Sequence, residues 1–165
     1  MNNHLLTSLL ALGFFVSSIH PTLALAQDEE WEKDPLSYAV GNFAAFAEIV
    51  NIGIKKMALS NALPSAEMEG LAREAVGIAE EREVDVYRET DFLVTDLFPM
   101  SATENKEVLI IYRGSTLNEY NELKARKAEL VEAGNYAGEA RREIAWAMGK
   151  LLSYPDEKIQ QLLGE

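Results

Sequence analysis

The chain has 165 residues, 27 acidic against 15 basic side chains, a formal net charge of −12 and no cysteine. A chain this acidic is repelled by the phosphates of nucleic acids and by anionic lipid surfaces, so we expect no nucleic-acid partner. The lack of cysteine excludes disulfides and thiolate chemistry, so the fold has to rest on its hydrophobic core.

Residues 1–26 have the pattern of a cleavable signal peptide. An apolar run over residues 5–19 is followed by the small-x-small tripeptide Ala24-Leu25-Ala26, the pattern that signal peptidase accepts. The segment carries no lysine or arginine, so the alternative is a retained membrane anchor, although the run is short for a bilayer span. We predict cleavage after Ala26, a periplasmic or secreted location, and no stable membrane insertion of the cleaved chain.

Both histidines, His4 and His20, lie in this leader. After cleavage the chain would contain neither imidazole nor thiol, the commonest catalytic bases, nucleophiles and transition-metal ligands. A nucleophile elbow, a phosphate-binding loop, a dinucleotide-binding motif and an EF-hand loop are also missing from the sequence. We therefore predict no catalytic residue, no metal and no cofactor, and we favour a protein that is not an enzyme.

Residues 27–33 indicate a mobile acidic lead-in, and residues 34–165 indicate a single domain. The first helix is predicted to begin at Asp34, an N-cap acceptor that is followed by proline at the first helical position. Apolar side chains cover most of its helical wheel, which predicts a helix that packs on several sides. We expect it to reach about Ser60, with Asn61 as its left-handed stop.

A second helix is predicted from Ser65, where an N-cap side chain precedes an apolar stripe at helical spacing. Arg82 interrupts this stripe, either because its stem covers the core or because it pairs with a carboxylate at the edge. Beyond it, β-branched and aromatic residues predict strands at residues 92–98 and 107–112, and residues 84–87 are a candidate third strand.

Three further helices are predicted in the C-terminal part. The first opens at a capping box formed by Thr116 and Glu119, the second spans about residues 138–152, and the last runs from about residue 154 to residue 163. The elements together predict a mostly helical single α+β domain. It would contain two N-terminal helices, a small antiparallel sheet of two or three strands, and three C-terminal helices.

A candidate anion or ligand site lies where the second predicted strand meets the next helix. Arg113, Ser115 and Thr116 combine a guanidinium, two hydroxyls and the free backbone N–H groups of a helix start, which together could hold a carboxylate or a phosphate. The alternative is structural, with Thr116 capping the helix and Arg113 paired with a nearby glutamate.

Trp146 is the candidate partner-binding residue. On a helical wheel it lies among charged side chains and opposite the apolar stripe of its helix. Tryptophan on a polar face is a typical anchor of protein interfaces. The alternative is that the last helix or the acidic lead-in covers it.

These observations favour a small exported acidic protein that binds a protein or a small ligand without catalysis. The alternative is a carboxylate-dependent hydrolase of the cell envelope, in which one protonated and one ionised carboxyl act together. Asp91 and Asp96 flank one predicted strand, and Glu104 and Glu107 flank the connector that follows it. A homo-oligomer joined through the apolar surface of the first helix is a third alternative.

Overall fold

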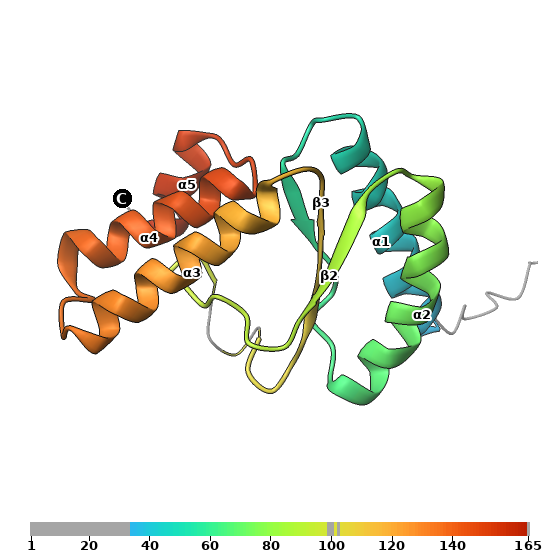
Figure 1. Cartoon of the computed structure of the whole chain (residues 1–165), viewed down its shortest axis with the longest axis horizontal. Helices are drawn as coiled ribbons and strands as arrows, with labels where there is room; N and C mark the ends of the chain where they lie inside the picture. Colours follow the sequence, from blue (N-terminus) through green and yellow to red (C-terminus); the bar gives the residue numbers. More distant parts are fainter. Residues whose placement is uncertain (1–33, 99–100, 102, 165) are drawn as a thin grey trace, which may run out of the picture. The chain divides into compact units, whose positions relative to one another are not determined.

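A computed structural model describes residues 34–98, 101 and 103–164 of the chain. The order of elements is α1 (Pro35–Asn51), β1 (Met57–Leu59), α2 (Ser65–Glu81), β2 (Asp85–Glu89), β3 (Val108–Tyr112), α3 (Thr116–Glu132), α4 (Gly138–Leu151) and α5 (Asp156–Leu163) (Figure 1). The predicted mostly helical α+β domain is confirmed. No helix in the described ranges has the length and apolar character that a bilayer span needs. The predicted signal peptide and acidic lead-in lie outside the described residues.

The three strands form one antiparallel sheet in the order β1-β3-β2. Tyr112 at the end of β3 pairs with Met57 of β1 on one side and with Asp85 of β2 on the other. Strands β1 and β2 therefore run in the same direction with β3 between them, and α2 makes the connection that crosses from one edge to the other.

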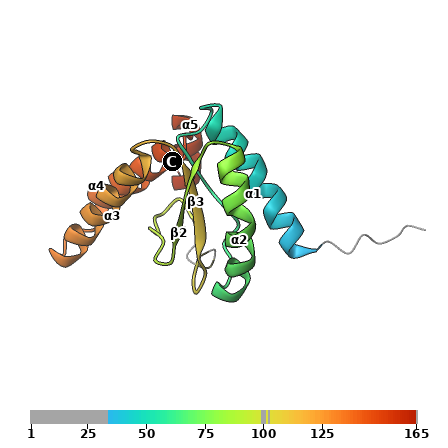
Figure 2. The same cartoon turned by 45° about the vertical axis from the view of Figure 1, so that its right-hand side comes forward.

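Helices cover both faces of the sheet, with α1 and α2 on one face and α3, α4 and α5 on the other (Figure 2). In β3, Leu109 and Ile111 belong to the core cluster of α1 and α2, whereas Val108 and Ile110 belong to the cluster of α3, α4 and α5. Burial on both faces explains why β3 is continuously apolar rather than alternating.

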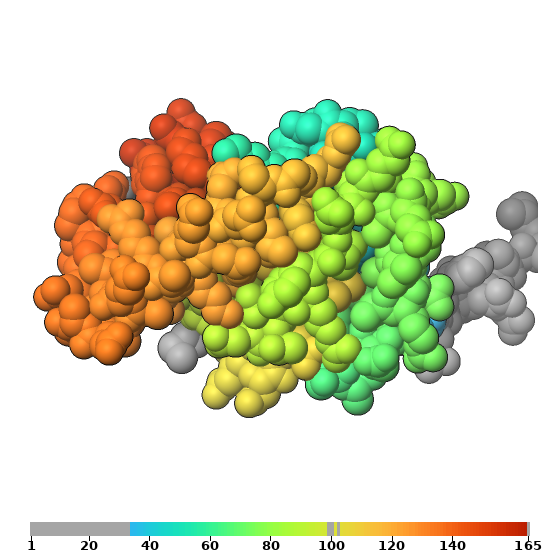
Figure 3. Space-filling view, in the orientation of Figure 1, coloured from blue at the N-terminus to red at the C-terminus, as the bar shows by residue number. Residues whose placement is uncertain are grey.

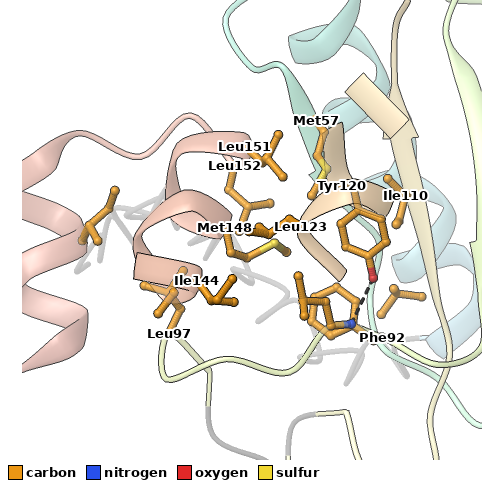
Figure 4. Packing of buried hydrophobic residues seen from close by; sticks show 14 residues of the cluster. Met57, Phe92, Leu97, Ile110, Tyr120, Leu123, Ile144, Met148, Leu151 and Leu152 are labelled. Atoms are coloured by element: carbon orange, nitrogen blue, oxygen red, sulfur yellow. Dashed lines mark hydrogen bonds between the residues drawn. The ribbon is translucent and has the colours of Figure 1, made fainter. Parts of the chain in front are cut away.

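The core under α3 and α4 also includes the segment that follows β2. Figure 3 shows α3, in orange, lying against this green segment, and Figure 4 shows the packed side chains between them. The ring of Phe92 stacks on that of Tyr120 with 6.4 Å between centroids, and the Tyr120 hydroxyl accepts a hydrogen bond from the backbone N–H of Leu93.

The first helix is shorter than predicted. It ends at Asn51, not near Ser60, because Gly53 adopts the left-handed conformation that closes a helix, with a φ of 78°. Residues 57–59 then form β1 and pair with β3. Because β1 is itself buried, its apolar residues continue the apolar pattern of the helix, and periodicity does not separate the two elements.

The predicted strand at residues 92–98 is wrong, and the candidate strand at residues 84–87 is present as β2. Phe92, Leu93 and Leu97 are buried, but the backbone of this segment bonds to side chains instead of to a neighbouring strand. Its aromatic and branched residues reflect burial in the core and not a β-ladder.

The helix starts agree with the predictions at one position and differ at two. The Asp34 carboxylate accepts from the backbone N–H groups of Leu36 and Ser37, which confirms the predicted N-cap. Ser65 is the first residue of α2 rather than its cap. The predicted capping box is wrong, because the Thr116 hydroxyl donates to the carbonyl of Arg113 and Ser115 occupies the cap position.

Candidate functional site

The residues of the predicted anion site have structural partners. Arg113 donates from Nη1 to the carbonyl of Asn51 at 2.8 Å, so its guanidinium satisfies the C-terminus of α1 rather than a glutamate. The hydroxyl of Thr116 donates to the carbonyl of Arg113 at 3.0 Å. Ser115 is exposed beside them at the start of α3. Ligand binding by Arg113, Ser115 and Thr116 stays a prediction.

Trp146 lies half-buried in a groove between α3 and α4 that has a volume of about 570 Å³. The Arg142 guanidinium lies 5.3 Å from the centroid of the Trp146 ring, and the Lys150 ammonium lies 5.9 Å from it. Both distances suit cation–π contacts, which orient the ring. No residue of α5 lines the groove, although Asp156 at the start of α5 pairs with Lys150 at its rim.

The walls of this Trp146 groove are apolar and its rim is charged. Leu123, Ala147 and Leu151 supply apolar walls. At the rim, Lys56 pairs with Glu119 at 3.4 Å, Arg126 with Glu143 at 2.7 Å, and Lys150 with Asp156. An apolar centre within a rim of polar and charged groups is typical of protein interfaces.

The carboxylates of the hydrolase alternative are distributed over two places. Asp96 accepts from Arg141 at 2.6 Å, and hydrogen bonding to this guanidinium lowers the pKa of the carboxyl. Asp91, Glu104 and Glu107 line a hollow of about 480 Å³, where Glu107 accepts from Arg88 at 2.6 Å and its pKa is lowered by that bond.

A general acid needs a raised pKa, which is the opposite of the shifts at Asp96 and Glu107. Across residues 34–98, 101 and 103–164, no three acidic or imidazole side chains gather where they could hold a metal ion. The geometry therefore gives the hydrolase alternative no specific support.

A buried polar network around Glu89 was not anticipated from the sequence. Glu89 is 3% exposed and accepts from the Tyr120 hydroxyl at 3.0 Å, from Lys124 Nζ at 3.2 Å and from the backbone N–H of Asp91 at 2.8 Å. Burial, followed by the charge of Glu89, raises the pKa of Tyr120. A strand predicted at residues 85–89 would have placed Glu89 on the face of the sheet that α3 covers.

A second feature missed by the sequence is an apolar hollow of about 250 Å³ beside β1, which we call the Lys55 hollow. Lys55 donates from Nζ to the carbonyl of Leu152 at 2.6 Å, and Nζ lies 4.9 Å from the centroid of the Tyr154 ring. Partial burial lowers the pKa of Lys55. The first helix was predicted to reach about Ser60 and therefore to include Lys55, which in the structure lies in the connector between α1 and β1. The other residues that line the Lys55 hollow include Phe46, Leu59, Phe92, Phe98, Thr103 and Val108.

The described residues thus present a groove around Trp146 whose lining charges are paired except at Glu122, and an apolar hollow that contains a single ammonium group. We compared the chain with protein-family models, with curated proteins and with solved structures, and none of the three comparisons found a match.

Proposed function

We propose that this protein is an exported, non-enzymatic binding module that holds a partner protein in the Trp146 groove. The observation that carries the proposal is a half-buried tryptophan in a groove that no residue of α5 lines. Trp146 offers a large, rigid apolar surface, and such residues contribute most to the free energy of protein association.

The groove favours a partner of particular chemistry. Leu123, Ala147 and Leu151 form walls that accept an apolar side chain, and that side chain would pack against the Trp146 ring. Of the five charged residues that line the groove, four are in ion pairs and only Glu122 is in none among the described residues, so a partner gains little from adding a charge beside the paired ones. We therefore expect a partner that inserts an apolar side chain and covers the rim with uncharged polar groups.

Export is the second part of the proposal and is supported by the sequence of residues 1–26. Mass spectrometry of the protein isolated from its native source tests it. We expect a chain that begins at Gln27, and a mass that includes the leader would contradict cleavage.

The Trp146→Ala variant tests the binding part. Immobilised wild-type protein and variant are incubated with the native envelope fraction, and each captured protein is quantified by mass spectrometry. We expect at least one protein to be retained by the wild type and lost, by about tenfold or more, from the variant.

Tyr38→Ala is the matched control, because Tyr38 is an exposed aromatic residue of α1, on the opposite helical layer. It should retain the same protein as the wild type. Equal capture by Trp146→Ala and the wild type, with unchanged circular dichroism, would show that the groove is not the binding site.

A further inference from the structure

We propose that the Lys55 hollow binds a small amphipathic carboxylate, an alkyl or arylalkyl acid whose apolar part fills the hollow and whose carboxylate contacts the Lys55 ammonium. This site is separate from the Trp146 groove. Lys55 and Lys56 are adjacent in the connector between α1 and β1, but Lys55 lines the hollow and Lys56 lines the groove.

The charge of the hollow points to an anion. Lys55 is the only charged residue among the described residues that line it, and no carboxylate of the described part pairs with this ammonium. A lysine ammonium has three N–H donors, of which one bonds to the Leu152 carbonyl and another can face the Tyr154 ring. A partly buried charge without a counter-ion is unfavourable, and a bound carboxylate would supply the missing counter-ion.

The size and walls of the hollow select the rest of the ligand. Its volume of about 250 Å³ exceeds that of the roughly 150 Å³ cavities that admit benzene and approaches the roughly 300 Å³ of small ligand sites. Phe92, Phe98, Leu59 and Val108 provide apolar walls from three separate segments of the chain. A short alkyl chain or one aromatic ring on a short linker fits these dimensions.

The experiment uses octanoate, octan-1-ol and octylamine as probes of one chain length with three head groups. Each is titrated into the purified protein below its aggregation concentration, and binding is followed by the NMR methyl signals of Leu59, Val108 and Leu152. We expect octanoate to shift these signals and to bind about tenfold more tightly than octan-1-ol, with octylamine weakest.

Two lysine variants test whether the preference for octanoate comes from the Lys55 ammonium in the hollow or from any positive charge nearby. Lys55→Met should lower the affinity for octanoate to that for octan-1-ol. Lys56→Met removes the neighbouring charge outside the hollow and should leave the preference for octanoate intact. The wild-type comparison of the three probes stands by itself if Lys55→Met does not fold.

Three results would overturn the proposal: no octanoate-dependent shift of these methyl signals, equal affinity for octanoate and octan-1-ol, or an unchanged preference in folded Lys55→Met. The outcome is independent of the proposed partner groove. Trp146→Ala should bind octanoate as the wild type does, and Lys55→Met should capture the same proteins as the wild type.

Discussion

Ionised side chains hold the segment at residues 91–97, which has no strand partner. Lys124 donates to the carbonyl of Asp91, and Lys127 donates to the carbonyl of Val94 at 2.7 Å. Arg141 of α4 binds the carboxylate of Asp96 at the end of the segment. Charged side chains of α3 and α4 bond to this segment where a β-strand would have a neighbouring strand. The attachment of the segment therefore depends on the ionisation of these side chains and of Asp96.

Asp96 should therefore make stability sensitive to acid. Its bond to Arg141 lowers the pKa of its carboxyl below the ordinary value of 3.8. On acidification the unfolded chain takes up the proton first, so the stabilisation is complete above the ordinary pKa and is lost as pH falls through the lowered one. We expect Asp96→Asn to lose less free energy of unfolding than the wild type between about pH 6 and about pH 3, measured by urea denaturation.

Arg141→Gln provides the comparison for this prediction, because it removes the other partner of the same pair. It should reduce the acid sensitivity in the same direction, and the double variant should add nothing further. Wild-type acid sensitivity in both single variants would mean that the pair does not contribute to pH-dependent stability.

At the scale of elements, α5 packs closely on α4 through a glycine. A Cβ atom added to Gly149 would lie 2.7 Å from Cγ1 of Ile159, and Ile159 is fully buried. Gly149 thus permits the close approach of the two helices. Without this contact, the short helix α5 would lack its one buried apolar anchor in the core.

Gly149→Ala should lower the free energy of unfolding. Overpacking costs about 1–3 kcal/mol, while alanine gains about 1 kcal/mol of helix propensity, so we expect a net loss of up to about 2 kcal/mol. Gly77→Ala is the matched control within α2, because its added Cβ has nothing within 4 Å. It should stabilise by about 0.5–1 kcal/mol in the same urea titration. Equal gains in both variants would exclude a close helix contact at Gly149.

The elements differ in how far the sequence could predict them. Helices α2 to α5 and strand β3 follow from periodicity and from turn residues, and Asp34 marks the start of α1 correctly. Strand β1 was hidden because a three-residue buried strand has no period of its own. Residues 92–98 resembled a strand because tertiary burial and β-propensity select the same residue types.

The candidate sites show the same limit. Trp146 could be selected from the sequence because one aromatic residue among charges on a helical wheel needs only local information. The Lys55 hollow and the Glu89 network could not be selected from the sequence in this way. Each joins residues from distant parts of the chain, such as Lys55 with Leu152 and Glu89 with Lys124. Such sites require the packing of the helices on the sheet.

At the scale of the whole domain, the two helical layers share one strand and are joined by direct bonds. Ile110 and Ile111 are neighbours in β3 but belong to the clusters on opposite faces of the sheet. Lys55 donates to the carbonyl of Leu152, and the backbone N–H of Lys56 donates to Ser153 Oγ at 2.8 Å. Loss of either layer would expose one face of β3, so both layers should unfold together.

Phe43→Leu tests this coupling from the side of α1. Phe43 is fully buried between α1, α2 and the sheet, so its replacement should lower the free energy of unfolding by about 1–2 kcal/mol. The second probe is Trp146 on α4, which is the only tryptophan left in a Trp31→Phe background. We expect Trp146 fluorescence and far-ultraviolet circular dichroism to show the same lowered urea midpoint. If the fluorescence midpoint instead stays at the value of the Trp31→Phe parent, Phe43→Leu has destabilised only the layer of α1 and α2. The layer of α3, α4 and α5 would then unfold by itself.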